Sequence, residues 1–438
     1  MPGPELDVPR LDAYAAELLR GGAGKALAVA LTDRDRTVAT RTYGAAASDA
    51  LWQIGSIGKS VTAVVTLQLV EQGILALDAP VADYLPWFGV RSDFAPITLH
   101  HLLNHTAGLI GTSDLAPASN YDVIALADTE AGFAPGQHRL YSNIGYRLVG
   151  VVLEVVTGKT FAELVQERVL DRLGMDHSTP AIVHDTRRRL AGGFVPFYDD
   201  RPWRPEHGLV PAPWIESADA DGCLCCTPAD LATYLRALWN DSDGRLMSPA
   251  MVRLMKSPMP PHGDEDDGDG YGYGLDVNPE GFGHGGDMIG YVSHMWADHD
   301  SGVGVVAFAT GIYGAWALAE AASAIARGEE PAKPALTLAE PLVDDGSCPP
   351  SWQPYLGRYR AHNPWQPTFH IAACAGELIL ATDWMDSQRL VLAPLVEATF
   401  RVGGPDWSPE RLRFDTVIDG RAQRATLSGM PYYRAFTS

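Results

Sequence analysis

The sequence predicts an α/β or α+β core followed by a small all-β domain. Helix signals and strand signals alternate from the N-terminus to residue 326, which is typical of a mixed core. Residues 327–350 carry five prolines and little periodicity, as a linker does. Beyond residue 350, short segments of alternating polarity dominate. We therefore expect a first domain at 1–326, a linker at 327–350 and a β-domain at 351–438.

The first half of the core contains a strand and two apolar helices. The run ALAVALTD at 26–33 predicts a strand. The run from Val61 has apolar side chains on most sides, so it predicts a largely buried helix that stops at Gly73. A second apolar helix follows YSN and is expected to end at Gly158.

The second half of the core continues the same alternation. Thr227 caps a predicted helix, and Pro228 is its first residue. The segment VGVVAFAT at 303–310 predicts a core strand that leads into a helix from about residue 315. The apolar run 302–326 approaches the roughly 20 residues that a membrane helix needs, but polar residues and glycines interrupt it, so we predict no membrane span.

The β-domain is marked by hairpin signals. Asp419-Gly420 stands between alternating flanks and predicts a two-residue hairpin turn. About ninety residues of such hairpins favour a small barrel or sandwich. We expect its bulky aromatic residues to fill the interior: Trp365, Phe369, Trp384, Phe400, Phe414, Tyr432 and Tyr433.

Composition and charge limit the kinds of molecule that this protein is expected to bind. A formal net charge of −21 argues against nucleic acid, because a polyanion would be repelled. The N-terminus lacks a basic segment followed by an apolar core, so no signal peptide is predicted. Five cysteines, an odd number in a long chain, indicate a reducing compartment without a disulfide framework. We expect a cytoplasmic protein that acts on a small molecule or short peptide; nothing in the sequence indicates its oligomeric state.

No metal site or cofactor is predicted. The segment CLCC (Cys223, Cys225 and Cys226) has no second cysteine pair or histidine cluster nearby, so core cysteines are favoured over zinc ligands. The acidic run at 265–269 only approximates a calcium loop and lacks flanking helices. A solvated acidic loop explains it better.

A serine and a lysine stand at the start of the first buried helix. Ser56 falls where the helix begins, and Lys59 follows three residues later, one turn along on the same face. The simpler interpretation is that Ser56 caps the helix while Lys59 extends to water. The pattern by itself favours that interpretation.

Two later segments favour a catalytic role for Ser56 and Lys59 over this simpler interpretation. Tyr141 and Asn143 precede the second apolar helix, and His284-Gly285-Gly286 precedes a predicted strand. Each is weak alone, because a tyrosine before a helix is usually a core residue and a histidine among glycines is usually a turn. The ordered set S-x-x-K, Y-x-N and H-x-G is much more specific.

With these motifs the sequence resembles the penicillin-recognising serine hydrolases, in the branch of class C β-lactamases, D,D-carboxypeptidases, D-aminopeptidases and β-lactamase-fold esterases. SIGK, YSN and HGG match the three motif positions, and phrases such as ITLHHLLNHTAGL are also alike. The likeness covers nearly all of residues 20–326 and implies an antiparallel sheet flanked by helices. From Tyr355 onward the chain looks like the lipocalin-like β-domain of some members.

The resemblance implies a role for each motif residue. A serine hydroxyl needs a base within hydrogen-bond reach. Ser56 would be the nucleophile, and Lys59 with Tyr141 would form one coupled acid/base unit in which either group takes the proton. Asn143 would orient Lys59 and hold a substrate amide or acyl group. His105 in NHTAG resembles a loop that supports the fold and is left outside the catalytic set.

The third motif is implied to hold the substrate. The backbone N–H groups of Ser56 and Asp287 would stabilise the oxyanion. Gly285 and Gly286 would contact the substrate. His284 stands where β-lactamases carry lysine, so it would offer a weaker and pH-dependent cation.

These roles predict a serine hydrolase that forms an acyl-enzyme on Ser56 and cleaves an ester or amide, such as a D-amino-acid amide or peptide or a small ester. An acyltransferase or peptide-cyclising thioesterase would use the same residues. A β-lactamase, a D,D-carboxypeptidase or a non-catalytic acyl-binding protein is less favoured. The β-domain is expected to shape substrate access and to contribute nothing to the chemical step.

Overall fold

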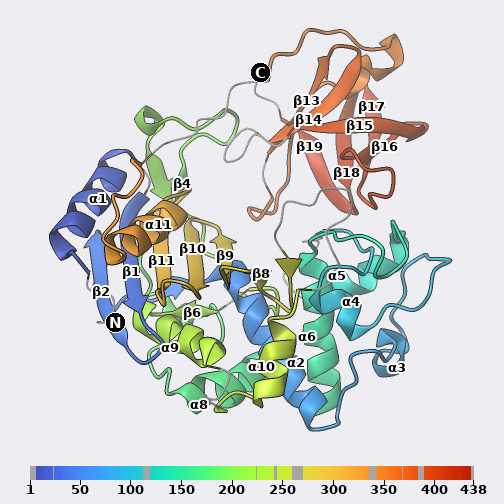
Figure 1. The fold of residues 1–438 in the computed structure, drawn as a ribbon. Coiled ribbons are helices and arrows are strands. Elements are labelled where there is room, and N and C mark those ends of the chain that lie inside the picture. Colours follow the sequence, from blue (N-terminus) through green and yellow to red (C-terminus); the bar gives the residue numbers. More distant parts are fainter. Residues whose placement is uncertain are drawn as a thin grey trace.

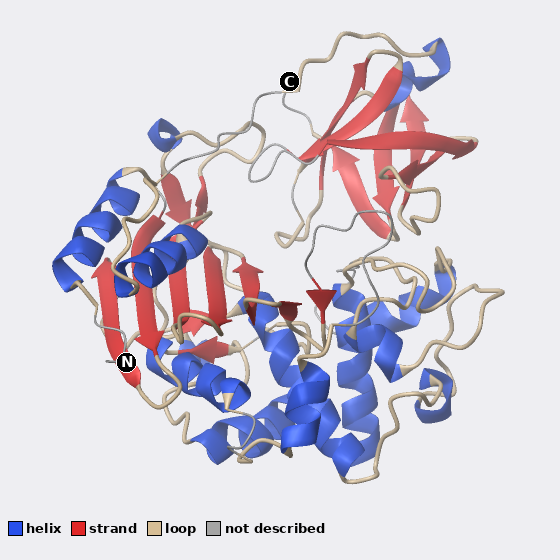
Figure 2. Cartoon of the chain, viewed as in Figure 1, coloured by secondary structure: helices blue, strands red, loops and turns tan. Residues whose placement is uncertain are grey.

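The computed structural model describes residues 6–22, 24–111, 119–222, 224–240, 244–258, 270–334, 342–366, 368–382 and 389–435. Figures 1 and 2 show a larger domain of strands and helices and a separate barrel that follows it in the chain. The acidic run at 265–269, Cys223 and Trp384 lie outside the described residues.

The larger domain is built on an antiparallel sheet, as the resemblance implies. Within the described residues the sheet has seven strands in the order β2-β1-β11-β10-β9-β8-β7. Their bounds are β1 (Gly24–Thr32), β2 (Thr37–Gly44), β7 (Gly270–Tyr271), β8 (Asp276–Asn278), β9 (Gly281–Met288), β10 (Tyr291–Asp298) and β11 (Gly304–Gly311). The strands predicted at 26–33 and 303–310 are therefore confirmed, and the structure shows that they pair with each other.

Two helices cover one face of this sheet (Figure 1). They are α1 (Val8–Arg20) and α11 (Ala315–Ala326), and α11 begins at the predicted residue. Leu11 and Leu18 of α1 and Leu318 of α11 pack with Leu27 and other apolar residues of that face. At about 25 cal/mol per Å² of buried apolar area, such side chains hold the helices on the sheet.

The other face packs against a helical region. Its helices are α2 (Gly58–Glu71), α3 (Val81–Tyr84), α4 (Leu99–Leu103), α5 (Ser119–Ala125), α6 (Asn143–Thr157), α7 (Phe161–Val165), α8 (Asp171–Leu173), α9 (Pro228–Trp239) and α10 (Pro249–Met255). Every residue of α2 from Gly58 to Leu69 is buried, which confirms the predicted buried helix. The predicted cap Thr227 accepts a hydrogen bond from the Asp230 nitrogen at the start of α9, and Gly158 ends α6 in a left-handed conformation.

Two short strand pairs complete the larger domain. The pairs are β3 (Trp52–Gln53) with β6 (Cys225–Cys226), and β4 (Phe194–Pro196) with β5 (Leu209–Pro211). Cys225 and Cys226 are buried free thiols, and burial raises the pKa of Cys225 to about 12. They are core residues, as predicted.

The C-terminal domain is a closed barrel, which decides between the barrel and sandwich predictions. Its strands are β12 (Gly357–Arg360), β13 (Phe369–Cys374), β14 (Glu377–Thr382), β15 (Arg389–Val396), β16 (Thr399–Val402), β17 (Arg411–Ile418), β18 (Arg421–Leu427) and β19 (Met430–Arg434). Asp419 and Gly420 link β17 to β18, both with positive φ, as a two-residue hairpin turn requires.

The predicted aromatic interior is partly right. Phe369, Phe400, Phe414 and Tyr432 are buried in the barrel cluster. Tyr433 is 40% exposed, because its neighbour Tyr432 points inward and strand side chains alternate. Trp365 precedes β13 and packs instead against the core of the larger domain.

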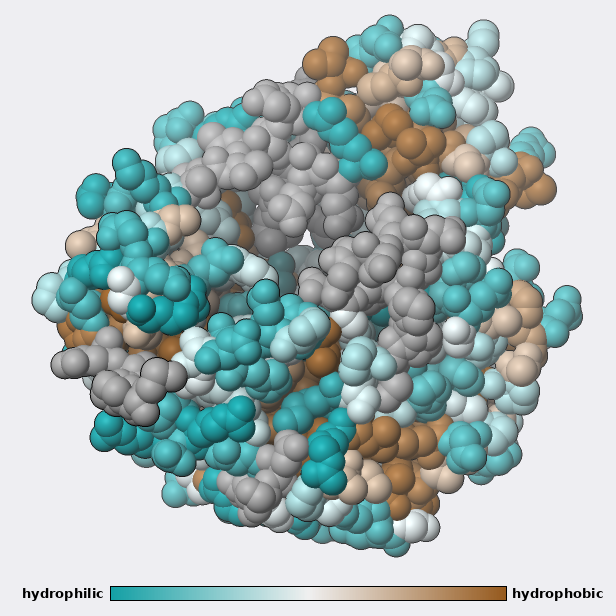
Figure 3. Space-filling view, in the orientation of Figure 1, coloured by the Kyte–Doolittle hydropathy of each residue, from teal (hydrophilic) through white to brown (hydrophobic). Residues whose placement is uncertain are grey.

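The barrel also carries exposed apolar side chains. Figure 3 shows hydrophobic residues gathered on the barrel, and further hydrophobic patches on the lower part of the larger domain. The exposed apolar residues at the ends of β15 and β17 are Leu395, Val396, Val417 and Ile418. In the part of the chain that the structure describes, no helix is long and apolar enough to cross a membrane.

Candidate active site

Ser56 lies at the junction between the sheet and the helical region. It belongs to the short 3-10 turn Gly55–Ile57, which runs directly into α2. Gly55 has φ +53°, and a Cβ there would lie 2.6 Å from the backbone nitrogen of Asp287 in β9. Only glycine allows this approach, so Gly55 brings the backbone of Ser56 close to that of Asp287.

Lys59 is fully buried, at 0% exposure, and does not extend to water. Its Nζ donates to Ser56 Oγ at 2.9 Å and to the Asp221 carbonyl oxygen at 2.7 Å. A buried cation is stable only where such partners replace its hydration shell. The simpler interpretation of Lys59 as a lysine that reaches solvent is therefore wrong.

The Asp221 carbonyl is held in place from α6. Arg147 Nε lies 3.2 Å from Asp221 Oδ2, and Arg147 Nη1 lies 2.6 Å from Asp122 Oδ2. The side chains of Arg147 and Asp221 are each 11% exposed, so the pair is only weakly screened by water. The sequence analysis did not identify Asp221, since a backbone carbonyl leaves no signal in residue type.

The position of Gly222, next to Asp221, explains why residue 58 of α2 is a glycine. A Cβ at Gly58 in α2 would lie 2.9 Å from the Gly222 Cα. A helical glycine costs roughly 1 kcal/mol relative to alanine. Here the missing side chain lets the Asp221–Gly222 backbone reach Lys59.

The aromatic ring of Tyr141 lies next to the Lys59 ammonium group. The Lys59 Nζ lies 4.9 Å from the Tyr141 ring centroid, a cation–π distance. The Tyr141 side chain is 41% exposed, and among the described residues its hydroxyl makes no hydrogen bond. Lys59 and Tyr141 are thus adjacent, as the coupled pair requires.

Asn143 is the first residue of α6. The Ser142 Oγ caps this helix by accepting from the Gly145 nitrogen at 3.1 Å. The Asn143 backbone nitrogen donates to the Gly111 carbonyl at 2.6 Å. The side-chain Oδ1 is buried and has no partner within the described residues. Lys59 is hydrogen-bonded by Asp221 instead of by Asn143, so Asn143 Oδ1 is left to meet another donor.

His284 lies in β9 and is buried. Burial lowers the pKa of His284 to about 4. The charges of Lys59 and Arg139 also lower this pKa, whereas a hydrogen bond to the Gly285 carbonyl raises it. The imidazole is therefore neutral at pH 7. The expected weak, pH-dependent cation would therefore form only in acid, because desolvation disfavours the charged ring.

A chain of hydrogen bonds links the Y-x-N and H-x-G motifs. The Ser142 nitrogen donates to His105 Nδ1 at 3.0 Å, so the proton of a neutral His105 is on Nε2. His105 Nε2 lies 3.2 Å from the Tyr271 hydroxyl, which lies 3.1 Å from His284 Nε2. His284 Nδ1 faces the Gly285 carbonyl oxygen at 2.5 Å.

Donor and acceptor counting assigns the protons of the two histidines in this chain. His105 Nε2–H donates to the Tyr271 oxygen, and the Tyr271 O–H has two acceptors, His284 Nε2 and the Tyr146 oxygen. His284 then keeps its proton on Nδ1, where it meets the Gly285 carbonyl. All three rings are buried, so this arrangement fixes the tautomer and orientation of His284. Tyr271 was missed in the sequence analysis and His105 was set aside, because neither stands in one of the three motifs.

The glycines of β9 have different roles. A Cβ at Gly286 would lie 2.0 Å from the Ile54 carbonyl oxygen, so glycine is required for β9 to pack beside Ser56. A Cβ at Gly285 would meet nothing within 4 Å. Gly285 therefore leaves open space next to His284.

One residue of the barrel reaches this region. Glu410, at the start of β17, accepts from the Gly111 nitrogen at 2.6 Å and also bonds the Ser428 hydroxyl. Three residues earlier, Trp407 stacks on His138 with ring centroids 4.6 Å apart. The loop between β16 and β17 is thus docked on the segment that leads to Tyr141.

The chain is similar to known proteins in sequence and in fold. A family model described as Beta-lactamase matches residues 11–330. The chain is 30% identical to penicillin-binding protein 4 of Amycolatopsis lactamdurans, over 48% of this chain and 58% of that protein. It is 34% identical to esterase EstB of Burkholderia gladioli, over 35% of this chain and 43% of that protein. The chain therefore spans about half the length of these curated relatives.

A solved structure matches both domains. The octameric penicillin-binding protein homologue from Pyrococcus abyssi superposes with a TM-score of 0.66, over 98% of this chain and 100% of that chain. The two sequences are 23% identical, so this likeness shows the fold alone.

Proposed function

Because this chain belongs to the Beta-lactamase family, we propose that it is a serine hydrolase that forms an acyl-enzyme on Ser56. The observation that carries the proposal is the contact between the buried Lys59 Nζ and Ser56 Oγ, at 2.9 Å. A fully buried lysine beside an accessible serine hydroxyl has a strong chemical reason only where the hydroxyl must lose its proton.

The proposed reaction uses groups that lie together. Ser56 Oγ attacks the carbonyl carbon of an ester or amide, and its proton passes to the Lys59–Tyr141 pair. Negative charge develops on the carbonyl oxygen, which the backbone N–H groups of Ser56 and Asp287 stabilise. The leaving group takes a proton and departs, and water then cleaves the acyl-enzyme with the same pair as base.

The neutral His284 supports a choice among substrates. An uncharged imidazole attracts a substrate carboxylate only weakly compared with the lysine that β-lactamases carry at this position. We therefore propose small esters, D-amino-acid amides or short peptides as substrates, with β-lactams turned over poorly. The relative from Burkholderia gladioli is named an esterase, which is in keeping with an ester substrate.

Labelling by a fluorophosphonate tests the nucleophile. Intact-mass and peptide mass spectrometry should place one adduct on Ser56 in the wild-type chain. The Ser56→Ala variant should fold normally, take up no adduct and lose several orders of magnitude of esterase activity. Ser92→Ala, at an exposed serine, serves as the control and should keep both. Labelling at another residue in the wild type would overturn the assignment.

Product analysis separates hydrolysis from acyl transfer. The enzyme is acylated with a small ester in the presence of increasing concentrations of a primary amine. We expect the free acid as the main product when the amine is dilute. A dominant amide product under those conditions would show that the acceptor is an amine and that the acyltransferase alternative is correct.

A further inference from the structure

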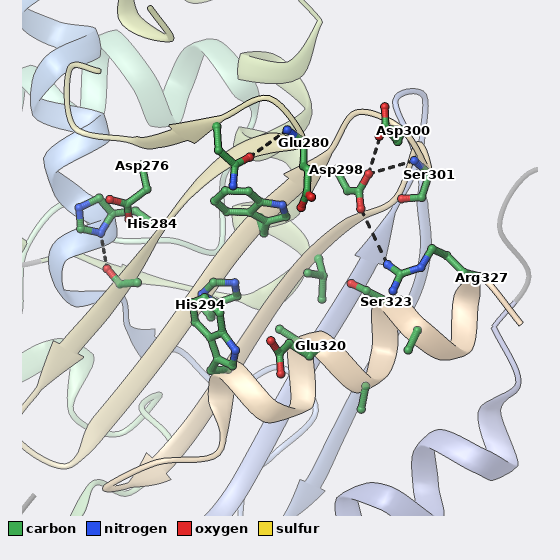
Figure 4. A pocket seen from close by; sticks show the side chains of 18 of the residues that line it. Asp276, Glu280, His284, His294, Asp298, Asp300, Ser301, Glu320, Ser323 and Arg327 are labelled. Carbon is green, nitrogen blue, oxygen red and sulfur yellow. Dashed lines mark hydrogen bonds and ion pairs between the residues drawn. The ribbon is translucent and has the colours of Figure 1, made fainter. Parts of the chain in front are cut away.

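A deep cleft begins at His284 and leads away from Ser56. Its volume is about 1060 Å³. One wall is β10 and the other is the exposed side of α11, so the cleft lies on the sheet face that α11 covers (Figure 4). The Tyr141 and His284 rings are 6.2 Å apart, which places the inner end of the cleft beside the catalytic groups.

Two aromatic rings form a platform in this cleft. His294 is 6% exposed, and its Nδ1 has no partner within the described residues. Trp316, in the first turn of α11, is 59% exposed and lies over His294 with ring centroids 4.4 Å apart. This arrangement does not favour stability. The exposed Trp316 ring leaves apolar surface in water, and the buried His294 Nδ1 has no hydrogen-bond partner among the described residues.

The lining of the cleft is acidic, with Asp276 beside His284 and the other acidic residues farther along the cleft (Figure 4). Five of its lining residues are acidic, namely Asp276, Glu280, Asp298, Asp300 and Glu320. Its two arginines are Arg139 and Arg327, and Arg327 lies 3.8 Å from Asp298 and 2.8 Å from Glu329. Arg139 is at the inner end, 5.3 Å from the Tyr271 ring centroid.

Of the acidic residues that line the cleft, Glu320 is the nearest in sequence to Trp316. It follows Trp316 by four residues on α11, so both side chains lie on the same face of the helix. Figure 4 shows Glu320 on α11 near His294 on β10. Burial lowers the pKa of His294 to about 4, so its ring is neutral at pH 7 and does not repel a cation.

The cleft connects His284 with the aromatic platform. Gly285 pairs with His294 across β9 and β10, so the two residues share one face of the sheet. The side chain of the neighbouring His284 points to the opposite face, because strand side chains alternate. The cleft is lined by His284, Gly285 and His294, so it passes between the two faces at Gly285, where a Cβ would meet nothing within 4 Å. A linear substrate bound at Ser56 would pass His284 and Gly285 to reach Trp316.

We propose that this cleft binds a cationic group of the substrate, with the cation on the Trp316 face, Glu320 beside it and His294 beneath. The inference rests on the proposed function and names the substrate class: esters or amides that carry an ammonium, quaternary ammonium or guanidinium group along the chain from the carbonyl. A tryptophan face and a carboxylate recognise such a cation together.

A matched pair of fluorophosphonates tests this site without knowledge of the natural substrate. The two probes differ only at the end of a short alkyl tether, which carries trimethylammonium in one and tert-butyl in the other. In both, Ser56 Oγ forms a bond to phosphorus as fluoride leaves. The measurement is the second-order rate constant of Ser56 labelling, read by mass spectrometry at low salt.

We expect the cationic probe to react at least about tenfold faster than the neutral probe, as a cation–π contact beside a carboxylate predicts. Trp316→Ala and Glu320→Gln should each lower this ratio toward one while the neutral probe keeps its rate. Glu397→Gln removes an exposed charge from the barrel and should leave the ratio unchanged.

The outcomes separate this inference from the proposed function. If neither probe labels Ser56, the proposed function fails. If both probes label Ser56 at equal rates in the wild-type chain, or if the ratio survives in both cleft variants, the cation site is wrong although the serine hydrolase stands.

Discussion

Glu410 of the barrel lies 2.6 Å from the backbone nitrogen of Gly111 in the larger domain. The carbonyl of the same Gly111 accepts from the Asn143 nitrogen, also at 2.6 Å. One residue of the larger domain thus connects the barrel to the start of α6. The expectation that the barrel only shapes access stays a prediction, and the contact of Glu410 beside the Y-x-N motif leads us to predict a positioning role in addition.

We predict that Glu410→Ala lowers kcat more than it changes KM. The substitution leaves the Gly111 N–H without its acceptor, which costs about 1–3 kcal/mol for a buried group. Glu410→Gln should restore most of the activity, since an amide oxygen also accepts a hydrogen bond. Burial raises the pKa of Glu410, so loss of the charge costs little there.

Asp406→Ala is the matched control for this prediction. Asp406 is in the same loop, and its side chain is 96% exposed against Arg401. The control should keep wild-type kcat. Equal losses in Glu410→Gln and Glu410→Ala would show that the hydrogen bond to Gly111 has no positioning role.

Lys59 and Tyr141 should behave as one unit. We expect Lys59→Met and Tyr141→Phe each to lower kcat/KM by roughly three orders of magnitude, with the double variant little worse than either. Tyr433→Phe, at an exposed tyrosine of the barrel, controls for loss of a hydroxyl. If the two single losses in kcat/KM multiply in the double variant, the two residues act in separate steps.

Tyr271→Phe should break the link between His105 and His284. The substitution removes the donor to His284 Nε2 and the acceptor for His105, so we predict a drop in kcat of about tenfold together with lower stability. Tyr273→Phe is the matched control, because Tyr273 is equally buried and bonds His100 at 2.7 Å outside this chain. A similar kcat in the two variants would assign Tyr271 a purely structural role.

Stability should fall with acid as the buried histidines take up protons. The pKa of His284 is about 4 in the folded protein against an ordinary value of 6.5. The folded state favours the neutral ring, so this contribution is complete above pH 6.5 and is lost as pH falls toward 4. It amounts to about 3 kcal/mol for His284.

Urea unfolding at several pH values measures this loss. His284→Gln should flatten the dependence of unfolding free energy on pH between 6.5 and 4. His362→Gln, at an exposed histidine of the C-terminal domain, should leave the dependence as in the wild type. An unchanged slope in His284→Gln would mean that His284 is not held neutral.

Gly58→Ala should destabilise the protein although alanine is the better helix former. The new methyl group would lie 2.9 Å from the Gly222 Cα, and backbone cannot move aside as a flexible side chain can. We expect a loss of about 1–3 kcal/mol in unfolding free energy. Gly89→Ala, where a Cβ meets nothing within 4 Å, is the control. A stabilised Gly58→Ala would show that helix propensity outweighs this contact.

Much of the fold and the three motifs could be predicted because they depend on neighbours in the chain. Apolar periodicity predicted the burial of α2, and a cap with a proline marked the first turn of α9. Asp419-Gly420 predicted a hairpin, since only a few residue types accept positive φ at both positions. Ser56 and Lys59 share a helix face because of their spacing alone.

The properties that come from distant parts of the chain were decided by the tertiary structure. His284 is neutral because burial and the charges of Lys59 and Arg139 outweigh its hydrogen bond, and none of these can be read from H-x-G. The partner of Lys59 is a backbone carbonyl at Asp221, 162 residues away. Glu410 contacts Gly111 across 299 residues. Sequence patterns record local geometry and polarity, whereas desolvation and long-range hydrogen bonds exist only once the chain has packed.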